Sequence, residues 1–258
     1  MKKTLFNVTG YLVLFVALQL VVATIVSVVG KYAFNTADNN PVVLLVSSGL
    51  ANVAAIAIFL AFKMSPIGKS YILSRPRATL AWSVVAALGV VLPSVWLQEF
   101  LPPLPDVVSE QLVKMMRVPG GYFVIAVITP LAEELVFRGA ILRQFSEGLK
   151  SRWLAIFISA LLFALVHGNP AQMPHAFAMG LLLGWMYCRT GSVLPGVAFH
   201  WCNNTLAYFL TLVLPDPDAR LIDLYGGNQQ SLILSIVFSL CILVPAIVQL
   251  NLRMKRAE

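Results

Sequence analysis

The sequence predicts an all-α polytopic membrane protein with about eight transmembrane helices. Hydrophobic residues make up 59% of the 258 residues, whereas only 11% are Asp, Glu, Lys or Arg. A soluble globular domain has about 45–50% apolar and about 25% charged residues, so the charges here are too few to cover a water-facing surface. The apolar residues also gather into runs of about 20, the length that crosses a bilayer. The composition therefore excludes a soluble enzyme, and also a disordered or disulfide-framed chain.

The first apolar run, 5–29, follows Lys2 and Lys3. It is longer than the roughly 7–15 residues of a signal-peptide core, so we expect a retained helix. Seven further runs follow in chain order: 42–62, 78–97, 122–142, 153–167, 173–188, 193–214 and 232–250. The fifth and sixth runs are short, and the polar sequence Gly168-Asn169-Pro170 separates them. The long loop 99–121 begins with a stiff proline-rich stretch, after which we expect a short interfacial helix at 109–117.

The distribution of basic residues predicts the topology. Thirteen Lys and Arg residues fall in loops on the side of the N-terminus, and four fall on the opposite side: Lys31, Lys114, Arg117 and Arg220. Cytoplasmic loops carry such an excess of positive charge, so both termini are expected to be cytoplasmic. The basic residues form short clusters between apolar runs, which indicates topology and lipid contact rather than nucleic-acid binding. All 258 residues are expected to form a single transmembrane domain.

Three ionisable residues lie inside the fourth apolar run: Glu133, Glu134 and Arg138. Each costs about 2.5–3.5 kcal/mol at the centre of a membrane helix on insertion scales, so such residues indicate function. Glu134 and Arg138 are four residues apart, share a helix face and can pair. Glu133 points about 100° away, into a different neighbourhood. One carboxylate is then neutralised and one is left for chemistry, unless the group is only a salt-bridge cluster that locks helix packing.

Two later runs carry further polar residues, His167 at the end of the fifth and His200 with Asn204 in the seventh. His200 and Asn204 are four residues apart and share a face. With little else polar at a similar depth, clustering these groups with Glu133 satisfies them together, because lipid cannot. We therefore expect a polar site inside the bilayer. The third histidine, His175, follows Pro174 at the start of a run, and we place it at the membrane interface.

The depths of the two histidines conflict if the helices are straight and perpendicular to the membrane. At about 1.5 Å per residue, His200 lies about 10 Å and His167 about 20 Å from the cytoplasmic end of its run. Tilted helices, or a fifth helix that begins in the cytosol, reconcile the two.

Such a site can hydrolyse an acyl bond, most naturally a peptide bond. Glu133 and a histidine can activate water as a general base, which contributes about 10²–10⁴-fold in rate. A second histidine and Asn204 can donate hydrogen bonds to an oxyanion. Alternatively, Glu133, His167 and His200 form a set of three zinc ligands, the number that catalytic zinc sites use in addition to water.

Three motifs occur in order: Glu133-Glu134-x-x-x-Arg138, Phe163-x-x-x-His167 and His200-x-x-x-Asn204. Together they resemble the motifs of the CAAX-protease and bacteriocin-processing family of intramembrane proteases, which includes the type II CAAX prenyl endopeptidases. The resemblance covers about residues 120–210, the expected protease core. It implies an eight-helix core with both termini in the cytosol.

The resemblance also implies a role for each motif residue. Glu133 and His167 would activate the attacking water, and His200 and Asn204 would stabilise the oxyanion. The Glu134–Arg138 pair would order the site. Members of the family are commonly labelled metalloproteases, but a metal-free glutamate mechanism is also proposed for them, so a zinc ion and no cofactor both stay open.

The prediction is therefore an intramembrane endopeptidase of the CAAX-processing type that cuts a membrane-associated peptide or protein. In the eukaryotic branch the substrate is prenylated, whereas bacterial relatives are linked to bacteriocin processing and self-immunity. Short loops and compact size favour a bacterial inner membrane. Two other classes fit the composition: a proton-coupled transporter, disfavoured by the lack of a repeated half, and a non-catalytic immunity or scaffold protein whose polar cluster only holds helices together.

Overall fold

The computed structural model describes residues 2–37, 39–66, 68–214 and 219–255. Over these residues the chain is all-α and contains no strand, which confirms the predicted fold class. The longer helices are α1 (Lys2–Phe34), α2 (Pro41–Ala61), α4 (Arg77–Gln98), α8 (Arg152–Val166), α9 (Met173–Thr190), α10 (Leu194–Val213) and α12 (Gln229–Arg253). The short helices are α3 (Lys69–Leu73), α5 (Ser109–Met116) and α11 (Leu221–Leu224).

Each of the eight predicted runs is helical, and the helix expected at 109–117 is α5. In the described part of the chain, α1, α2, α4 and α12 are long and apolar enough to cross a membrane by length and composition. Side-chain hydrogen bonds to the backbone fix where α2 and α8 begin. Asn40 accepts a hydrogen bond from the Val42 N–H and precedes a proline at the first position of α2, while Ser151 caps α8 by accepting from the Leu154 N–H.

The fourth predicted run departs from a regular α-helix. It consists of a π-helix η1 (Phe123–Ile128), one turn of α-helix α6 (Thr129–Glu133) and a second π-helix η2 (Glu134–Leu142), and α7 (Arg143–Gly148) follows it. A π-helix has wider turns than an α-helix, because its hydrogen bonds span five residues, and such segments occur frequently at functional sites. Pro130 lacks an N–H, so the regular hydrogen-bond ladder is interrupted where η1 gives way to α6. The predicted single α-helix is therefore wrong in detail.

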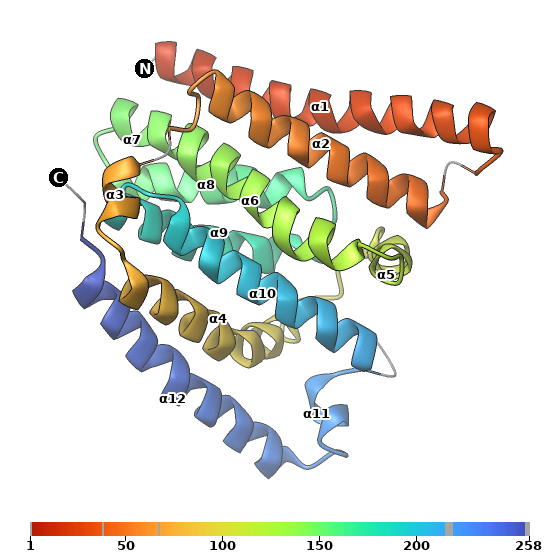
Figure 1. Cartoon of the computed structure of the whole chain (residues 1–258). Coiled ribbons are helices and arrows are strands. Elements are labelled where there is room, and N and C mark those ends of the chain that lie inside the picture. The colour runs from red at the N-terminus through yellow and green to blue at the C-terminus, as the bar shows by residue number, and fades with distance from the viewer. Residues whose placement is uncertain (1, 38, 67, 215–218, 256–258) are drawn as a thin grey trace.

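Two helix pairs flank the segments that carry the polar residues. Figure 1 shows α1 and α2 side by side on one side of the molecule and α4 with α12 on the other, with α6, α8, α9 and α10 between them. One core cluster around Phe59, Phe137 and Phe163 joins the α1–α2 pair to η2 and α8. A second cluster around Leu183 and Phe199 joins α9 and α10 to α4 and α12.

Several of the basic loops gather at one end of the bundle. The Arg143 Nη2 donates to the Met64 carbonyl at 2.9 Å, and the Arg189 Nη2 donates to the Asn251 carbonyl at 2.7 Å. The start of α1 and the end of α12 lie at this end too (Figure 1). The arrangement agrees with termini on one side of the membrane, and the face of the membrane to which this side corresponds stays a prediction.

Close contact between α8 and α9 depends on a small residue. A Cβ atom added to Gly180 would lie 2.8 Å from the Cβ and 2.9 Å from the Cα of Ala160. Gly180 and Gly184 are four residues apart, the spacing that lets membrane helices approach closely. We expect Gly180→Ala to lower the free energy of unfolding by about 1–3 kcal/mol through overpacking, measured by denaturation in detergent.

Gly10→Ala is the matched control for this prediction. Gly10 lies within α1, and a Cβ atom there would have no neighbour within 4 Å. Alanine replaces glycine in a helix interior with a gain of about 0.5–1 kcal/mol, so the control should be neutral or stabilising. Equal destabilisation by both variants would contradict the proposed packing contact.

Candidate active site

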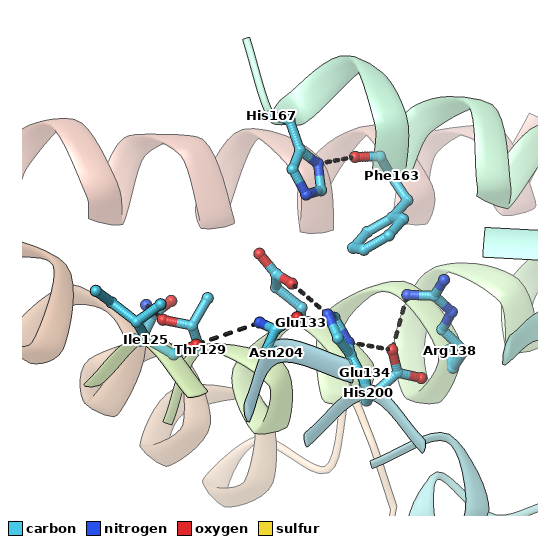
Figure 2. Close-up of polar contacts among 10 residues, drawn as sticks. Ile125, Thr129, Glu133, Glu134, Arg138, Phe163, His167, His200 and Asn204 are labelled. Atoms are coloured by element: carbon cyan, nitrogen blue, oxygen red, sulfur yellow. Dashed lines mark hydrogen bonds and ion pairs between the residues drawn. The ribbon is translucent and has the colours of Figure 1, made fainter. Parts of the chain in front are cut away.

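The six predicted site residues come from four segments of the central layer. Glu133 ends α6, Glu134 and Arg138 belong to η2, His167 follows α8, and His200 and Asn204 lie on α10. Figure 2 shows the carboxylate of Glu133 extending between the His167 ring and the pair formed by His200 and Asn204. The fold therefore brings residues up to 71 positions apart in sequence to one place, as their predicted clustering requires.

Glu134 and Arg138 form the predicted pair. Arg138 Nη1 lies 3.0 Å from Glu134 Oε1, and the side chains are 1% and 0% exposed. Arg138 also stacks over Phe163, with its Cζ atom 4.2 Å from the ring centroid, a favourable cation–π distance. The ion pair is short but poorly aligned, since none of the three guanidinium nitrogens makes a hydrogen bond within the described part of the chain. Charge attraction and ring stacking therefore hold Arg138.

His200 bridges the two adjacent glutamates. Its Nδ1 lies 3.1 Å from Glu134 Oε1, and its Nε2 lies 3.6 Å from Glu133 Oε2. A carboxylate only accepts hydrogen bonds, so Nδ1 carries a proton, and a second proton on Nε2 would lie on the side of Glu133 and the cavity. One buried imidazole thus contacts both glutamates, which the spacing along their own helix did not predict.

His167 and Asn204 are each oriented by a backbone carbonyl. His167 Nδ1 donates to the Phe163 carbonyl at 2.8 Å, and Asn204 Nδ2 donates to the Ile125 carbonyl at 3.2 Å. In the neutral ring, Nε2 of His167 therefore carries the lone pair. One N–H of the Asn204 amide is used by Ile125, and the second is left to donate.

The predicted difference in depth between His167 and His200 does not keep the two rings apart, because both line one cavity. His167 lies at the end of α8, whereas His200 lies near the start of α10, so the two helices are offset along their length.

A cavity of about 340 Å³ contains these groups. We call it the catalytic cavity. Glu133, His167, His200 and Asn204 line it, whereas the buried Glu134 and Arg138 lie behind His200. Three methionines and several aliphatic residues supply much of the remaining wall. A peptide group that enters this cavity meets one carboxylate, histidine rings and side-chain amides beside these apolar residues.

Comparison with known proteins identifies the segment that carries these residues. Residues 117–206 match the family described as type II CAAX prenyl endopeptidase Rce1-like, and all six motif residues lie within that range. The segment that carries the site is Rce1-like. The resemblance predicted from the three motifs is thereby confirmed.

Two relatives are each similar to part of this chain. The chain is 28% identical over 154 residues to the membrane-embedded CAAX protease MroQ of Staphylococcus aureus (strain USA300), covering 57% of this chain and 62% of that protein. It is 34% identical over 86 residues to an uncharacterized 24.3 kDa protein of Escherichia coli, covering 32% of this chain and 40% of that protein. The chain thus spans less than two thirds of either relative. No solved structure matches.

The residues of the Rce1-like site do not fit the predicted set of three zinc ligands. Among the described residues, no group of three or more His, Cys, Asp or Glu side chains is arranged to hold a metal ion. Nδ1 of His167 contacts a carbonyl and Nδ1 of His200 contacts a carboxylate, as in metal-binding histidines, so the missing feature is the convergence of the three side chains on one point. A catalytic zinc site takes three protein ligands, and the geometry offers no such triad.

Sequence reasoning missed several polar residues of the cavity. His175 lines the catalytic cavity, so all three histidines of the chain lie in its wall and the interfacial placement of His175 is wrong. Gln172 and Asn203 line it as well. The expectation of little else polar at this depth is therefore also wrong. Gln172 and His175 are three residues apart at the start of α9, and that shared face was the available signal.

Proposed function

We propose that this protein is an intramembrane endopeptidase of the CAAX-processing type. One observation supports the proposal above the others. The Glu133 carboxylate lies in a cavity with histidine rings and side-chain amides, while its neighbour Glu134 is already neutralised by Arg138. Within the described residues Glu133 has no arginine or lysine partner, so its carboxylate can accept a proton, which is what water activation requires.

In the proposed reaction Glu133, assisted by His167, takes a proton from a water molecule as its oxygen attacks the peptide carbonyl. The C=O electron pair moves to the oxygen, and this oxyanion accepts hydrogen bonds from Nε2–H of protonated His200 and the second N–H of Asn204. The C–N bond then breaks as the oxyanion collapses, and Glu133 returns the proton to the leaving nitrogen. No step uses Glu134 or Arg138 directly, because their part is to hold His200 in place.

The substrate is a membrane-associated peptide or protein, with a prenylated CAAX-type peptide as the first candidate because of the family match. We further propose that residues 1–258 form a single transmembrane domain, with the protease core at about 120–210. The protein would lie in a bacterial inner membrane, with both termini in the cytoplasm.

Peptide cleavage by the detergent-purified protein tests this function. A prenylated CAAX-type peptide and a panel of hydrophobic peptides serve as substrates, and mass spectrometry locates the cut. We expect at least one peptide to be cleaved at a single bond. If the wild-type protein cleaves no peptide in the panel, either in detergent or in proteoliposomes, the endopeptidase proposal fails.

The effect of a metal chelator is a separate prediction. Because the site does not assemble three metal ligands among the residues described, we expect the rate of cleavage to stay within about twofold of its starting value after treatment with a strong chelator. Loss of activity that only added zinc restores would contradict the glutamate mechanism and favour a metal site.

A further inference from the structure

A second cavity of about 270 Å³ adjoins the catalytic cavity on the side of α1 and α2. We call it the α1–α2 chamber. The two cavities share five lining residues: Ser48, Thr129, Glu133, Phe163 and His167. They therefore meet at the proposed general base, and a chain held across Glu133 would extend into both.

Three polar side chains from three different helices form a hydrogen-bonded ladder along the α1–α2 chamber. The Gln19 Nε2 of α1 donates to Asn52 Oδ1 at 3.1 Å, and the Asn52 Nδ2 of α2 donates to Thr129 Oγ1 at 2.9 Å. Asn52 is 3% exposed and also donates to the Ser48 hydroxyl at 3.4 Å. The proposed chemistry uses none of these residues.

The ladder leaves two hydrogen-bonding groups at its ends. The Thr129 hydroxyl accepts from Asn52, so its own proton is free to be donated, and no acceptor for it occurs among the described residues. The Oε1 of Gln19 likewise has no donor within the described part of the chain. Both residues line the chamber. Thr129 lies four residues before Glu133 and so shares its helix face.

The remaining walls of the chamber are apolar and include Phe15, Phe137 and Val166. A peptide in such a setting cannot leave its backbone N–H and C=O groups unpaired, because each unsatisfied group costs several kcal/mol in a membrane. One free donor and one free acceptor match one C=O and one N–H of an extended peptide. The amides of Gln19 and Asn52 also link helices and so stabilise the fold. That structural role does not require the Thr129 hydroxyl proton and Gln19 Oε1 to face a cavity.

We propose that the α1–α2 chamber is the subsite for the substrate segment on one side of the scissile bond. The Thr129 hydroxyl donates to a substrate carbonyl, the Gln19 amide oxygen accepts from a substrate N–H, and Asn52 is the positioning residue that holds both. The apolar walls take the side chains of the same segment. This inference rests on the proposed endopeptidase function.

Steady-state cleavage by three variants tests the subsite, with the peptide that the wild-type protein cleaves best. Thr129→Val keeps the shape of the side chain but removes the hydroxyl, and Gln19→Leu removes the amide. We expect each to raise KM about five- to tenfold, the value of one net hydrogen bond, with kcat changed less than twofold. Thr129→Ser restores the hydroxyl and should return KM to the wild-type value.

Asn7→Leu is the matched control for Gln19→Leu. Asn7 also lies on α1 and makes a single bridging hydrogen bond, from its Nδ2 to Gln144 Oε1 at 2.9 Å, outside both cavities. We expect Asn7→Leu to lower thermal stability about as much as Gln19→Leu while leaving KM unchanged. Equal KM values for all of these variants and the wild type would overturn the subsite and leave only a structural role for the ladder.

The two proposals fail in different ways in this experiment. If the wild-type protein cleaves no peptide, the endopeptidase function is contradicted, and the subsite proposal is then contradicted as well. Normal wild-type cleavage with an unchanged KM in Thr129→Val and Gln19→Leu contradicts the subsite alone. A matching rise in the Kd of a fluorescent substrate peptide, measured in the inactive Glu133→Gln background, supports binding rather than chemistry as the step affected.

Discussion

Replacement of Glu133 by Gln should lower kcat/KM for peptide cleavage by about 10²–10⁴-fold, the contribution of a general base. Glutamine has nearly the same size and can still accept a hydrogen bond, but it cannot take the proton of the attacking water. The variant should stay folded, because within the described part of the chain Glu133 makes a single polar contact, with His200 at 3.6 Å, and its side chain is 16% exposed. Rates of cleavage by wild type and variant at equal protein concentration measure the effect.

Glu147→Gln is the control for this replacement. Glu147 lies on α7, its side chain is 59% exposed, and its nearest cation, Arg143, is 3.9 Å away. Activity equal to that of the wild type is expected. If Glu133→Gln keeps its activity while Glu147→Gln behaves as expected, another group activates the water and the proposed mechanism is wrong.

Arg138→Met should lower the free energy of unfolding by about 3–5 kcal/mol, the typical cost of breaking a buried ion pair. The variant leaves the Glu134 carboxylate, which is 0% exposed, without its counter-charge. It also removes the cation from the face of Phe163. Denaturation in detergent measures the change, and loss of activity should accompany it because His200 is held through Glu134.

The double variant Arg138→Met with Glu134→Gln separates charge from packing. Without the carboxylate there is no uncompensated charge, so most of the lost stability should return. The amide oxygen that Glu134→Gln introduces can still accept a hydrogen bond from His200 Nδ1. Arg152→Met, at an exposed position, controls for the loss of an arginine. A double variant as unstable as Arg138→Met alone would show that packing of the arginine, not its charge, dominates.

The sequence identified the site through local spacing. Glu134 and Arg138 are four residues apart, and that separation brings them together in an α-helix and in the wider π-helix that the structure contains. The eight apolar runs likewise predict eight helical stretches, because a run of apolar residues long enough to span lipid is helical wherever it lies. Helix capping by Asn40 and Ser151 is equally local.

The partners of His200 could not be predicted in the same way. Sequence spacing places Glu133 and Glu134 on different parts of one helix, but it says nothing of a ring from α10 that fits between them. That ring comes from another helix, and hydropathy along one helix does not register such a contact. His175 was misplaced for the same reason, because residues at the start of an apolar run are assigned to the interface by default.

The sequence by itself indicated the membrane class, the order of the helices and the six motif residues, because these follow from composition, from spacing within each of three runs and from the resemblance that the three motifs carry. Only the tertiary structure decided which side chains from different helices meet. The bridging position of His200, the third histidine in the cavity wall and the ladder from Gln19 to Thr129 all depend on helix tilt, helix depth and the π-helical turns. Contacts between helices arise from packing of residues that are far apart in sequence. The spacing of residues along a single helix does not predict such contacts.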